Sequence, residues 1–555
     1  MSYWRTGVLT LALAVLTIAG PLAGAATEIG SEVVPGTYDR VAAEIAQAEL
    51  SNQLIELEGV LPEAVIAKAT AEQLQKLAEA PDDQGRLLVG TNIEIGLVAD
   101  GEAVSGFGTV RETDQGKIWV GVVQAPQAKA IRLHFSQLNL PKGAELFVYN
   151  DLGEAFGPYT KQGPLGDGEL WAHTLRGSEA RIQVHFGQGI AASARGGQLF
   201  VLEQAVHLGD KFLFAILGDP TEAFCSFNAS CVQNAECSSI PSAIQATRNA
   251  MAHLQFAVGS STYICSGGLL NDTDTSTQIP YLLTANHCFS SASSASSLEA
   301  YFQFSTSCGG SCYNPNGAVP RTVGSTIMAT NSSSDYTLVR LSGSLPSGSV
   351  LLGWNATAVA NSSGTSLYRI SHPKGAPQAY STHSVNTTSG TCSGIPRGGW
   401  IYSDDTFGAT EGGSSGSVVM NSSGQVVGQL TGACGASPST PCDGDDRTID
   451  GALAAYFSSV QSYLDPGTGG GGCSGGTQYS GSLSSGGSST HGQGTKSGTI
   501  TGSLSCSGPD FDLYLDKQSC SWWSCSWSTV ASSTSTNCSE SINYSGSSGT
   551  YRWRV

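Results

Sequence analysis

Three short segments of the chain carry a histidine, an aspartate and a serine that could together activate a hydroxyl group as a nucleophile. His287 and Asp335 each border an apolar run, and Ser415 lies in the glycine-flanked segment 412–417. A serine hydroxyl becomes nucleophilic when an imidazole accepts its proton, and a carboxylate on the other ring nitrogen fixes the imidazole tautomer. The pattern therefore predicts Ser415 as nucleophile, His287 as general base and then acid, and Asp335 as the orienting carboxylate.

The order of these residues is more informative than any one of them. Histidines at strand ends and aspartates in turns are common structural residues, and serine and glycine abound in this chain. The aspartate follows the histidine by 48 residues (335 − 287) and the serine follows the aspartate by 80 (415 − 335), in the chain order of the double-β-barrel serine peptidases. Glycines beside Ser415 allow a sharp turn, so we expect the N–H groups of Gly413 and Ser415 to form an oxyanion hole, at about 3–4 kcal/mol per donor.

Six ordered segments carry a more specific resemblance: 265–271, 284–288, 334–338, 370–375, 410–417 and 428–432. Through them, less than half of the chain resembles the bacterial secreted trypsin-like serine peptidases, most closely the lysyl endopeptidase group. The resemblance implies hydrolysis of peptide bonds through an acyl-enzyme, a disulfide between Cys265 and Cys288 beside the catalytic histidine, and a structural role for His372.

The segment departs from many peptidases of this fold immediately before the nucleophile. They carry an aspartate there, which pairs with a freed N-terminal amine, whereas this chain has Ser414 and no Ile-Val-Gly-Gly-like start near residue 220. Activation by that ion pair is chemically unavailable. The resemblance implies removal of a covering pro-region instead, with a cut between Asp210 and Cys225.

Substrate preference is left open by the residues expected to line the specificity pocket, which are Ala409, Thr410, Leu430, Thr431, Gly432 and Thr448. In the lysyl endopeptidase group the acid that selects a basic side chain lies three residues before a glycine. Anchoring on Gly451 puts Thr448 there, whereas a shifted gap would bring Asp446 or Asp450 into the pocket. The alternative is that these acids form a solvated loop.

Composition excludes several classes of protein. The chain has 555 residues and a formal net charge of −18, from 26 basic and 44 acidic residues, and it lacks a Lys/Arg run, so nucleic acid is not an expected partner. Abundant glycine, 15 cysteines, 4 methionines and 13% charged residues are typical of an exported, loop-rich β protein. The apolar run 8–19 follows Arg5 and is too short to span a membrane. It predicts a signal peptide and therefore a secreted protein, and the absence of another long apolar run predicts a soluble mature form. The resemblance implies a bacterial source, and we expect a monomer.

Charge and cysteine content both change near residue 218. Residues 26–217 carry 39 charged side chains in 192 positions, residues 218–555 carry 30 in 338, and every cysteine lies at or after Cys225. Helical periodicity over 38–54 and 62–80 gives way to period-two strands over 91–214, and a helix is expected over 453–464. We therefore expect a signal peptide (1–25), a pro-region of helices and a β-sandwich (26–220), a peptidase domain (221–465), a Gly-rich linker (466–477) and a C-terminal β module (478–555).

The remaining cysteines do not determine their own partners. Cys225 is expected to pair with Cys434 or Cys442, and Cys231 with Cys308 or Cys312. The sequence has no Cys-x-x-Cys pair and no His/Cys cluster with the spacing of a tetrahedral zinc site, so no metal or cofactor is predicted. The tail resembles the bacterial pre-peptidase C-terminal domain through residues 510–515 and 546–555.

The predicted protein is mainly β, with a chymotrypsin-like double β-barrel between a β-rich pro-region and a small β-sandwich. Its expected function is that of a secreted serine endopeptidase made as a zymogen, with peptides or proteins as substrates and its own pro-region as intramolecular inhibitor and chaperone. One alternative is an esterase with the same triad, although segment 413–417 lacks the final glycine of the Gly-x-Ser-x-Gly elbow. The other is an inactive binding protein or adhesin.

Overall fold

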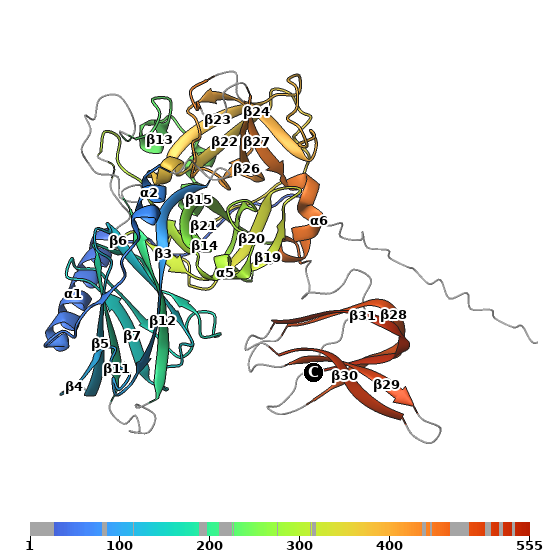
Figure 1. Cartoon of the computed structure of the whole chain (residues 1–555). Helices are drawn as coiled ribbons and strands as arrows, with labels where there is room; N and C mark the ends of the chain where they lie inside the picture. Colours follow the sequence, from blue (N-terminus) through green and yellow to red (C-terminus); the bar gives the residue numbers. More distant parts are fainter. Residues whose placement is uncertain are drawn as a thin grey trace, which may run out of the picture.

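The computed structural model of the chain contains three β-rich units (Figure 1). We call them the N-terminal unit (27–209), the barrel unit (225–466) and the C-terminal module (488–555). The predicted signal peptide, the processing region before Cys225 and most of the linker lie outside the described residues. Those residues are 27–79, 86–114, 116–187, 197–209, 225, 227–274, 276–310, 312, 318–435, 440–443, 447–466, 488–505, 512–520, 525–534 and 539–555.

Two helices begin the N-terminal unit, and local capping explains where each starts. Helix α1 (Arg40–Glu58) follows Asp39, whose carboxylate accepts a hydrogen bond from the Ala42 N–H at 3.0 Å. Helix α2 (Ala71–Glu79) follows Thr70, which forms a reciprocal capping box with Gln73. The helix expected over 62–80 is therefore shorter, because its first residues include strand β2 (Val65–Ile66), which pairs in parallel with Val123 and Gln124.

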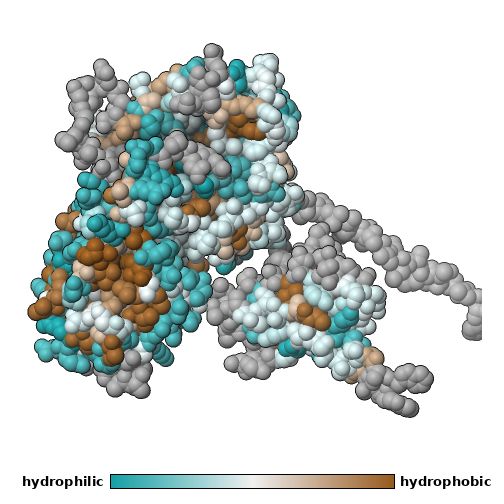
Figure 2. Space-filling view, in the orientation of Figure 1, coloured by the Kyte–Doolittle hydropathy of each residue, from teal (hydrophilic) through white to brown (hydrophobic). Residues whose placement is uncertain are grey.

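A β-sandwich follows, as predicted. One sheet contains β3 (Leu87–Asp100), β12 (Gln198–Leu208), β6 (Ala130–Ser136), β9 (Leu170–Trp171) and β10 (Leu175–Arg176). The other contains β2, β4 (Thr109–Thr113), β5 (Gly116–Gln124), β7 (Ala144–Tyr149), β8 (Ala155–Tyr159) and β11 (Glu179–Phe186). Edge-to-face rings of Trp119, Phe200 and Phe135 fill the space between the sheets. Figure 2 shows hydrophobic side chains gathered on one face of this unit.

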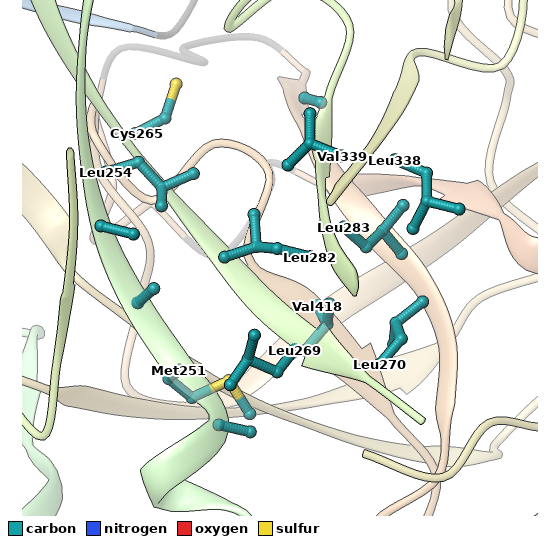
Figure 3. Packing of buried hydrophobic residues seen from close by; sticks show 14 of the residues in the cluster. Met251, Leu254, Cys265, Leu269, Leu270, Leu282, Leu283, Leu338, Val339 and Val418 are labelled. Atoms are coloured by element: carbon teal, nitrogen blue, oxygen red, sulfur yellow. The ribbon is translucent and has the colours of Figure 1, made fainter. Parts of the chain in front are cut away.

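The first barrel closes through a bend in one strand run. Its strands are β14 (Met251–Val258), β15 (Ser261–Leu270), β16 (Tyr281–Ala285), β17 (Glu299–Phe302), β18 (Arg321–Val323), β19 (Ser325–Asn331) and β20 (Tyr336–Leu341). At Gly324, with φ +81°, the run turns so that β18 pairs with β17 and β19 pairs with β20. Leu254, Leu269, Leu282 and Leu338 pack inside (Figure 3).

The second barrel closes through pairing of β23 with β24. Its strands are β22 (Ser366–Ser371), β23 (Ala379–Val385), β24 (Trp400–Phe407), β25 (Val418–Met420), β26 (Val426–Cys434) and β27 (Arg447–Ala452), with β13 (Gln233–Asn234) added to β23. Helix α6 (Leu453–Leu464) follows directly, over the predicted residues. The prediction of a double β-barrel is thus confirmed. None of the helices in the described part of the chain is long and apolar enough to span a membrane.

Short elements connect the barrel strands. They are η1 (Ala235–Cys237), α4 (Ser242–Gln245), η2 (Arg248–Ala250), α5 (Ala292–Ser296), β21 (Val350–Leu351) and η3 (Pro373–Gly375). Strand β1 (Glu32–Val33), near the start of the N-terminal unit, pairs with β21.

A continuous sheet joins the N-terminal unit to the first barrel. Strand β3 pairs with β12 on one side and with Ser261–Ile264 of β15 on the other. The boundary near residue 218 therefore marks a change in composition, whereas the sheet itself runs across both units.

A fully buried carboxylate lies at this junction. Glu299 accepts hydrogen bonds from Thr174 Oγ1 at 2.7 Å and from Arg321 at 3.2 Å, and lies 3.5 Å from Arg132 Nε. Burial alone would raise its pKa, but Arg132 and Arg321 together lower the pKa of Glu299 below its ordinary value of 4.5. The ionised carboxylate of Glu299 therefore stabilises the junction fully at pH values above about 4.5, its ordinary pKa. This stabilisation is lost as the pH falls through the lowered pKa.

The C-terminal module contains one described sheet of four strands. They are β28 (Thr490–Ser505), β31 (Ser539–Arg554), β29 (Leu513–Cys520) and β30 (Cys525–Ser533), in that spatial order. Asp516 pairs with Arg552 and Arg554 across the sheet.

The disulfides confirm one predicted pair and correct the others. Cys265 and Cys288 are bonded. Cys225 bonds Cys312 and Cys231 bonds Cys442, so both expected sets of partners were wrong, and the remaining described bonds are Cys237–Cys308, Cys392–Cys434 and Cys520–Cys525. Each partner was decided by which loops the two barrels bring together, and spacing along the chain does not encode that. Cys473, Cys506 and Cys538 lie outside the described residues.

Removing one charge from the junction should destabilise the protein strongly. We expect Arg132→Met to lower the free energy of unfolding by about 3–5 kcal/mol, because it leaves Glu299 underpaired and removes hydrogen bonds to the carbonyls of Ala172 and Ser297. The matched control is Arg447→Met, which removes a half-exposed pair with Asp404 and should cost below about 1 kcal/mol. Urea unfolding of both variants measures the difference, and equal losses would contradict the proposed importance of the buried cluster.

Candidate active site

The histidine and the aspartate meet because their strands are neighbours. Strands β16 and β20 pair antiparallel with Ala285 opposite Tyr336, so the residues just beyond that pair emerge at the same end of the barrel. His287 Nδ1 lies 2.7 Å from Asp335 Oδ2, and the His287 N–H donates to Asp335 Oδ1 at 2.8 Å. Two contacts to one carboxylate fix both the position and the tautomer of the imidazole.

Asp335 is held in an unfavourable backbone conformation by contacts from both barrels. Its φ is +49°, and its carbonyl accepts hydrogen bonds from the Asn286 N–H at 3.0 Å and from Gln429 Nε2 at 3.1 Å. Tyr456, on α6, donates to Gln429 Oε1 in turn. Gln429 lies in a segment that the sequence comparison matched, but nothing in the sequence assigned it this role.

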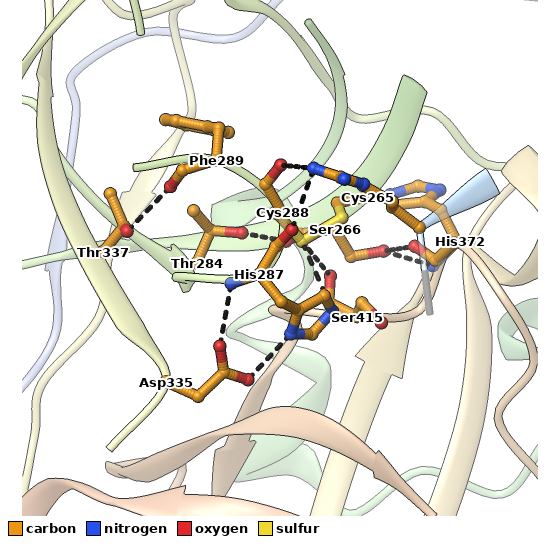
Figure 4. Close-up of a disulfide and its surroundings, with 12 residues drawn as sticks. Cys265, Ser266, Thr284, His287, Cys288, Phe289, Asp335, Thr337, His372 and Ser415 are labelled. Carbon is orange, nitrogen blue, oxygen red and sulfur yellow. Dashed lines mark hydrogen bonds and ion pairs between the residues drawn. A yellow bond between two sulfur atoms is a disulfide. The ribbon is translucent and has the colours of Figure 1, made fainter. Parts of the chain in front are cut away.

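Ser415 lies on a tight turn that enters β25. Gly413 and Gly416 flank it with φ of +92° and +79°. A Cβ on Gly416 would lie 2.1 Å from Thr284 Oγ1 and 2.6 Å from the Ser266 carbonyl, so glycine is required there. In Figure 4 the His287 ring lies between Asp335 and Ser415.

Ser266 of β15 anchors this turn from the first barrel. Its N–H donates to the Ser415 carbonyl and its hydroxyl donates to the Gly413 carbonyl, both at 2.8 Å. The two residues expected to form the oxyanion hole therefore have their carbonyls fixed. The sequence showed Ser266 only as part of a matched segment, because its partners lie about 150 residues away.

The loop carboxylate is paired by a lysine of the chain itself. The position before Ser415 holds Ser414 and not an acid. Ser414 is fully buried, and its hydroxyl accepts a hydrogen bond from Ser371 at 3.1 Å. Glu411 carries the nearby charge instead, and its carboxylate lies 3.0 Å from Lys374 Nζ. This ion pair joins the loop before Ser415 to η3.

The disulfide Cys265–Cys288 packs against the imidazole. Cys288 Sγ lies 3.9 Å from His287 Nε2 and 3.7 Å from the Ser415 carbonyl, so one sulfur atom contacts both parts of the site. The two sulfurs and the imidazole could resemble metal ligands by distance, but sulfurs bonded to each other are not thiolates. This group therefore fits a structural disulfide and not a metal site.

His372 has the structural role that the resemblance implied. It is fully buried, and its Nδ1 lies 2.8 Å from the Ala376 carbonyl oxygen. Burial lowers the pKa of His372 to about 4, so its ring is neutral at pH 7.

The predicted pocket residues are only partly brought together. Leu430, Thr431 and Gly432 belong to β26. They lie beside the turn of Ser415, where the Gly416 N–H donates to the Leu430 carbonyl at 2.8 Å. Thr448 lies on the adjacent strand β27, opposite Ala433. Thr410 is half-buried just before the turn. Ala409 packs against Val232 and Ala379.

The acids considered for this pocket are unequal. Asp450 lies 2.6 Å from Arg369, and both side chains are fully buried, so the Arg369 guanidinium already balances the Asp450 carboxylate. Asp446 lies outside the described residues. Asp405, which the sequence did not single out, accepts a hydrogen bond from Thr448 Oγ1 at 2.9 Å and lies 2.6 Å from His383 Nδ1.

Asp405 is ionised despite partial burial. Burial alone would raise its pKa. The hydrogen bond and charge of His383, together with the hydrogen bond from the Thr448 hydroxyl, lower the pKa of Asp405 below its ordinary range. Its side chain is 27% exposed, whereas that of Asp450 is 0% exposed. Among the acids in the described part of the chain, Asp405 is thus one that contacts Thr448 and is accessible to solvent.

Comparison with known proteins supports the resemblance found in the sequence. Residues 225–447 match the lysyl endopeptidase C-terminal domain family. A lysyl endopeptidase of Pseudomonas aeruginosa is 31% identical over 222 residues, which are 38% of this chain and 46% of that protein. The chain thus spans about half the length of this relative. The resemblance to lysyl endopeptidases is confirmed over this part of the chain.

Solved structures of proteases also align with the chain, at low TM-scores. A protease from M. tuberculosis in its active form aligns at a TM-score of 0.28 and 14% identity, over 41% of this chain and 86% of that chain. The serine endoprotease from Yersinia pestis aligns at 0.28 and 15% identity, over 40% of this chain and 65% of that chain.

Crowding at Gly416 can be separated from its backbone conformation by a matched pair of variants. Gly364 has the same φ of +79° but nothing within 4 Å of an added Cβ. We expect Gly364→Ala to lower the free energy of unfolding by about 1–2 kcal/mol and Gly416→Ala by about 3 kcal/mol or more. Urea denaturation provides both values, and similar losses would show that the contacts to Thr284 and Ser266 are not restrictive.

Proposed function

We propose that the protein is a serine endopeptidase that uses Ser415, His287 and Asp335 as its catalytic triad. The observation that carries this proposal is the pair of contacts from His287 to one Asp335 carboxylate, with Ser415 on the other side of the ring. The match of residues 225–447 to lysyl endopeptidases supports the same activity.

The geometry suggests how the residues divide the work. With Nδ1 facing Asp335, the His287 ring presents Nε2 to accept the Ser415 proton as Oγ attacks the peptide carbonyl. The N–H groups of Gly413 and Ser415 stabilise the oxyanion. The imidazolium then gives its proton to the leaving amine, and water repeats the sequence on the acyl-enzyme to release the acid and restore Ser415.

We propose further that the chain is exported as a precursor whose N-terminal unit is the pro-region. The apolar segment 8–19 and the six described disulfides support export. Pairing of β3 with β15 and the buried Glu299 cluster support a role for the N-terminal unit in folding the first barrel and covering the site. Maturation would cut the chain between Asp210 and Cys225.

Preference for Lys or Arg before the cleaved bond is proposed to depend on Asp405. It is the ionised, partly exposed acid next to Thr448, the position where the resemblance places the selecting acid. Asp450 is excluded from this role by its pairing with Arg369.

Labelling with a fluorophosphonate tests the triad directly. We expect the full-length protein, after processing, to be labelled at Ser415 and Ser415→Ala to remain unlabelled. Asp335→Asn should lower kcat by about 10⁴-fold because the imidazole loses its correct tautomer. Absence of labelling would favour an inactive binding protein, and hydrolysis of esters without peptides would favour an esterase.

A peptide library read by mass spectrometry tests the preference. We expect cleavage after Lys and Arg in the processed wild type, and a loss of about tenfold or more in that preference for Asp405→Asn. Asp404→Asn is the matched control, since Asp404 neighbours Asp405 and accepts from Asn386. A wild-type profile without enrichment of basic residues before the cut would exclude this specificity.

A further inference from the structure

An arginine of the N-terminal unit reaches the backbone of the catalytic histidine. Arg86 Nη1 donates to the His287 carbonyl at 3.2 Å and to the Cys288 carbonyl at 3.3 Å. Its guanidinium carbon lies 4.6 Å from the centre of the Tyr263 ring. An aromatic face and two carbonyl oxygens thus surround a single cation beside the active site.

The strand that follows Arg86 lies on β15 as an extended peptide would. Leu87 and Leu88 stand opposite Ile264 and Tyr263, and Gly90 stands opposite Thr262, in antiparallel register. Added strands of this kind are a common way for a protein to bind a peptide, with backbone pairing for affinity and side-chain subsites for selectivity.

The direction of β3 indicates whether the edge of β15 would bind the part of a substrate before the cleaved bond or the part after it. Strand β15 runs from Ser261 toward Ser266, which bonds the Ser415 carbonyl. Because β3 is antiparallel, its first residues lie nearest the nucleophile and its later residues run away from it. A peptide bound in this direction has its N-terminal part at Ser415. Serine keeps that part as the acyl group, so the residues along β15 belong to the leaving group.

We infer that Tyr263 and the carbonyls of His287 and Cys288 form a leaving-group subsite that selects arginine, and that Arg86 occupies it in the precursor. This inference rests on the proposed peptidase function. In the register of β3, the selected arginine falls at the first or second residue after the cleaved bond.

The chemistry of the subsite favours a guanidinium over other side chains. A planar cation can stack on the Tyr263 ring while its N–H groups reach the carbonyl oxygens, which a neutral or acidic side chain cannot do. Lysine would keep the charge but lose the stacked, planar geometry. Arginine is therefore expected first, lysine second, and citrulline, alanine and glutamate last.

Peptides that differ only after the cleaved bond test this inference. The full-length chain is first processed to remove the N-terminal unit. The resulting enzyme is then given quenched-fluorescence peptides that share the same residues before the cleaved bond. These peptides carry Arg, Lys, citrulline, Ala or Glu at the first or second residue after it. We expect kcat/KM to be about tenfold higher for Arg than for citrulline at one of these positions. Equal values for Arg and citrulline at both positions would overturn the inference.

Variants of Tyr263 locate the preference. Tyr263→Ala should reduce the Arg/citrulline ratio to about twofold or less, whereas Tyr263→Phe keeps the ring and should preserve the ratio. An undiminished ratio in Tyr263→Ala would overturn the assignment. The wild-type ratio alone still tests the selectivity should Tyr263→Ala fail to fold. Phosphonate labelling at Ser415 separates the two proposals: a labelled enzyme without arginine preference refutes the subsite alone, and an unlabelled protein that hydrolyses no peptide refutes the peptidase function and the subsite with it.

Discussion

Antiparallel pairing of β16 with β20 is the constraint on which the site depends. It brings the ends of two strands together, so that His287 and Asp335 meet across 48 residues of sequence. A shift of one strand by one residue would move its side chains to the opposite face and separate the pair. The apolar side chains inside the first barrel oppose such a shift, because each would leave the core. The core therefore maintains the contact between His287 and Asp335 as well as the stability.

Strand β15 connects the parts of the molecule that must act together. Its first residues pair with β3 of the N-terminal unit, Cys265 is bonded to the residue after His287, and Ser266 holds the turn of Ser415. The N-terminal unit thus contacts the same strand that holds the turn of Ser415. The proposed roles of the N-terminal unit in folding and in covering the site both rest on this one pairing.

Local patterns in the sequence were sufficient for some features. Helix α6 spans the predicted residues, and the turn around Ser415 has the backbone that its glycines suggested. The disulfide beside His287 was implied by the family resemblance and is present. The prediction for segment 62–80 was less accurate, because part of this segment forms β2 and pairs with a strand about 60 residues away. Periodicity reports the local preference and not the pairing that overrides it.

The amino-acid sequence by itself determined which residues could do the chemistry, their order, and the strands and turns that carry them. The tertiary structure alone decided the partners: Gln429 on the Asp335 carbonyl, Arg369 on Asp450, Asp405 on Thr448 and Arg86 on the His287 carbonyl. It also decided four of the five described disulfides in the barrel unit: two differ from the expected pairs, and two were not predicted. The physical reason is that hydrogen bonds, ion pairs and disulfides need atoms within a few ångströms, and barrel closure sets those distances between residues far apart in the chain.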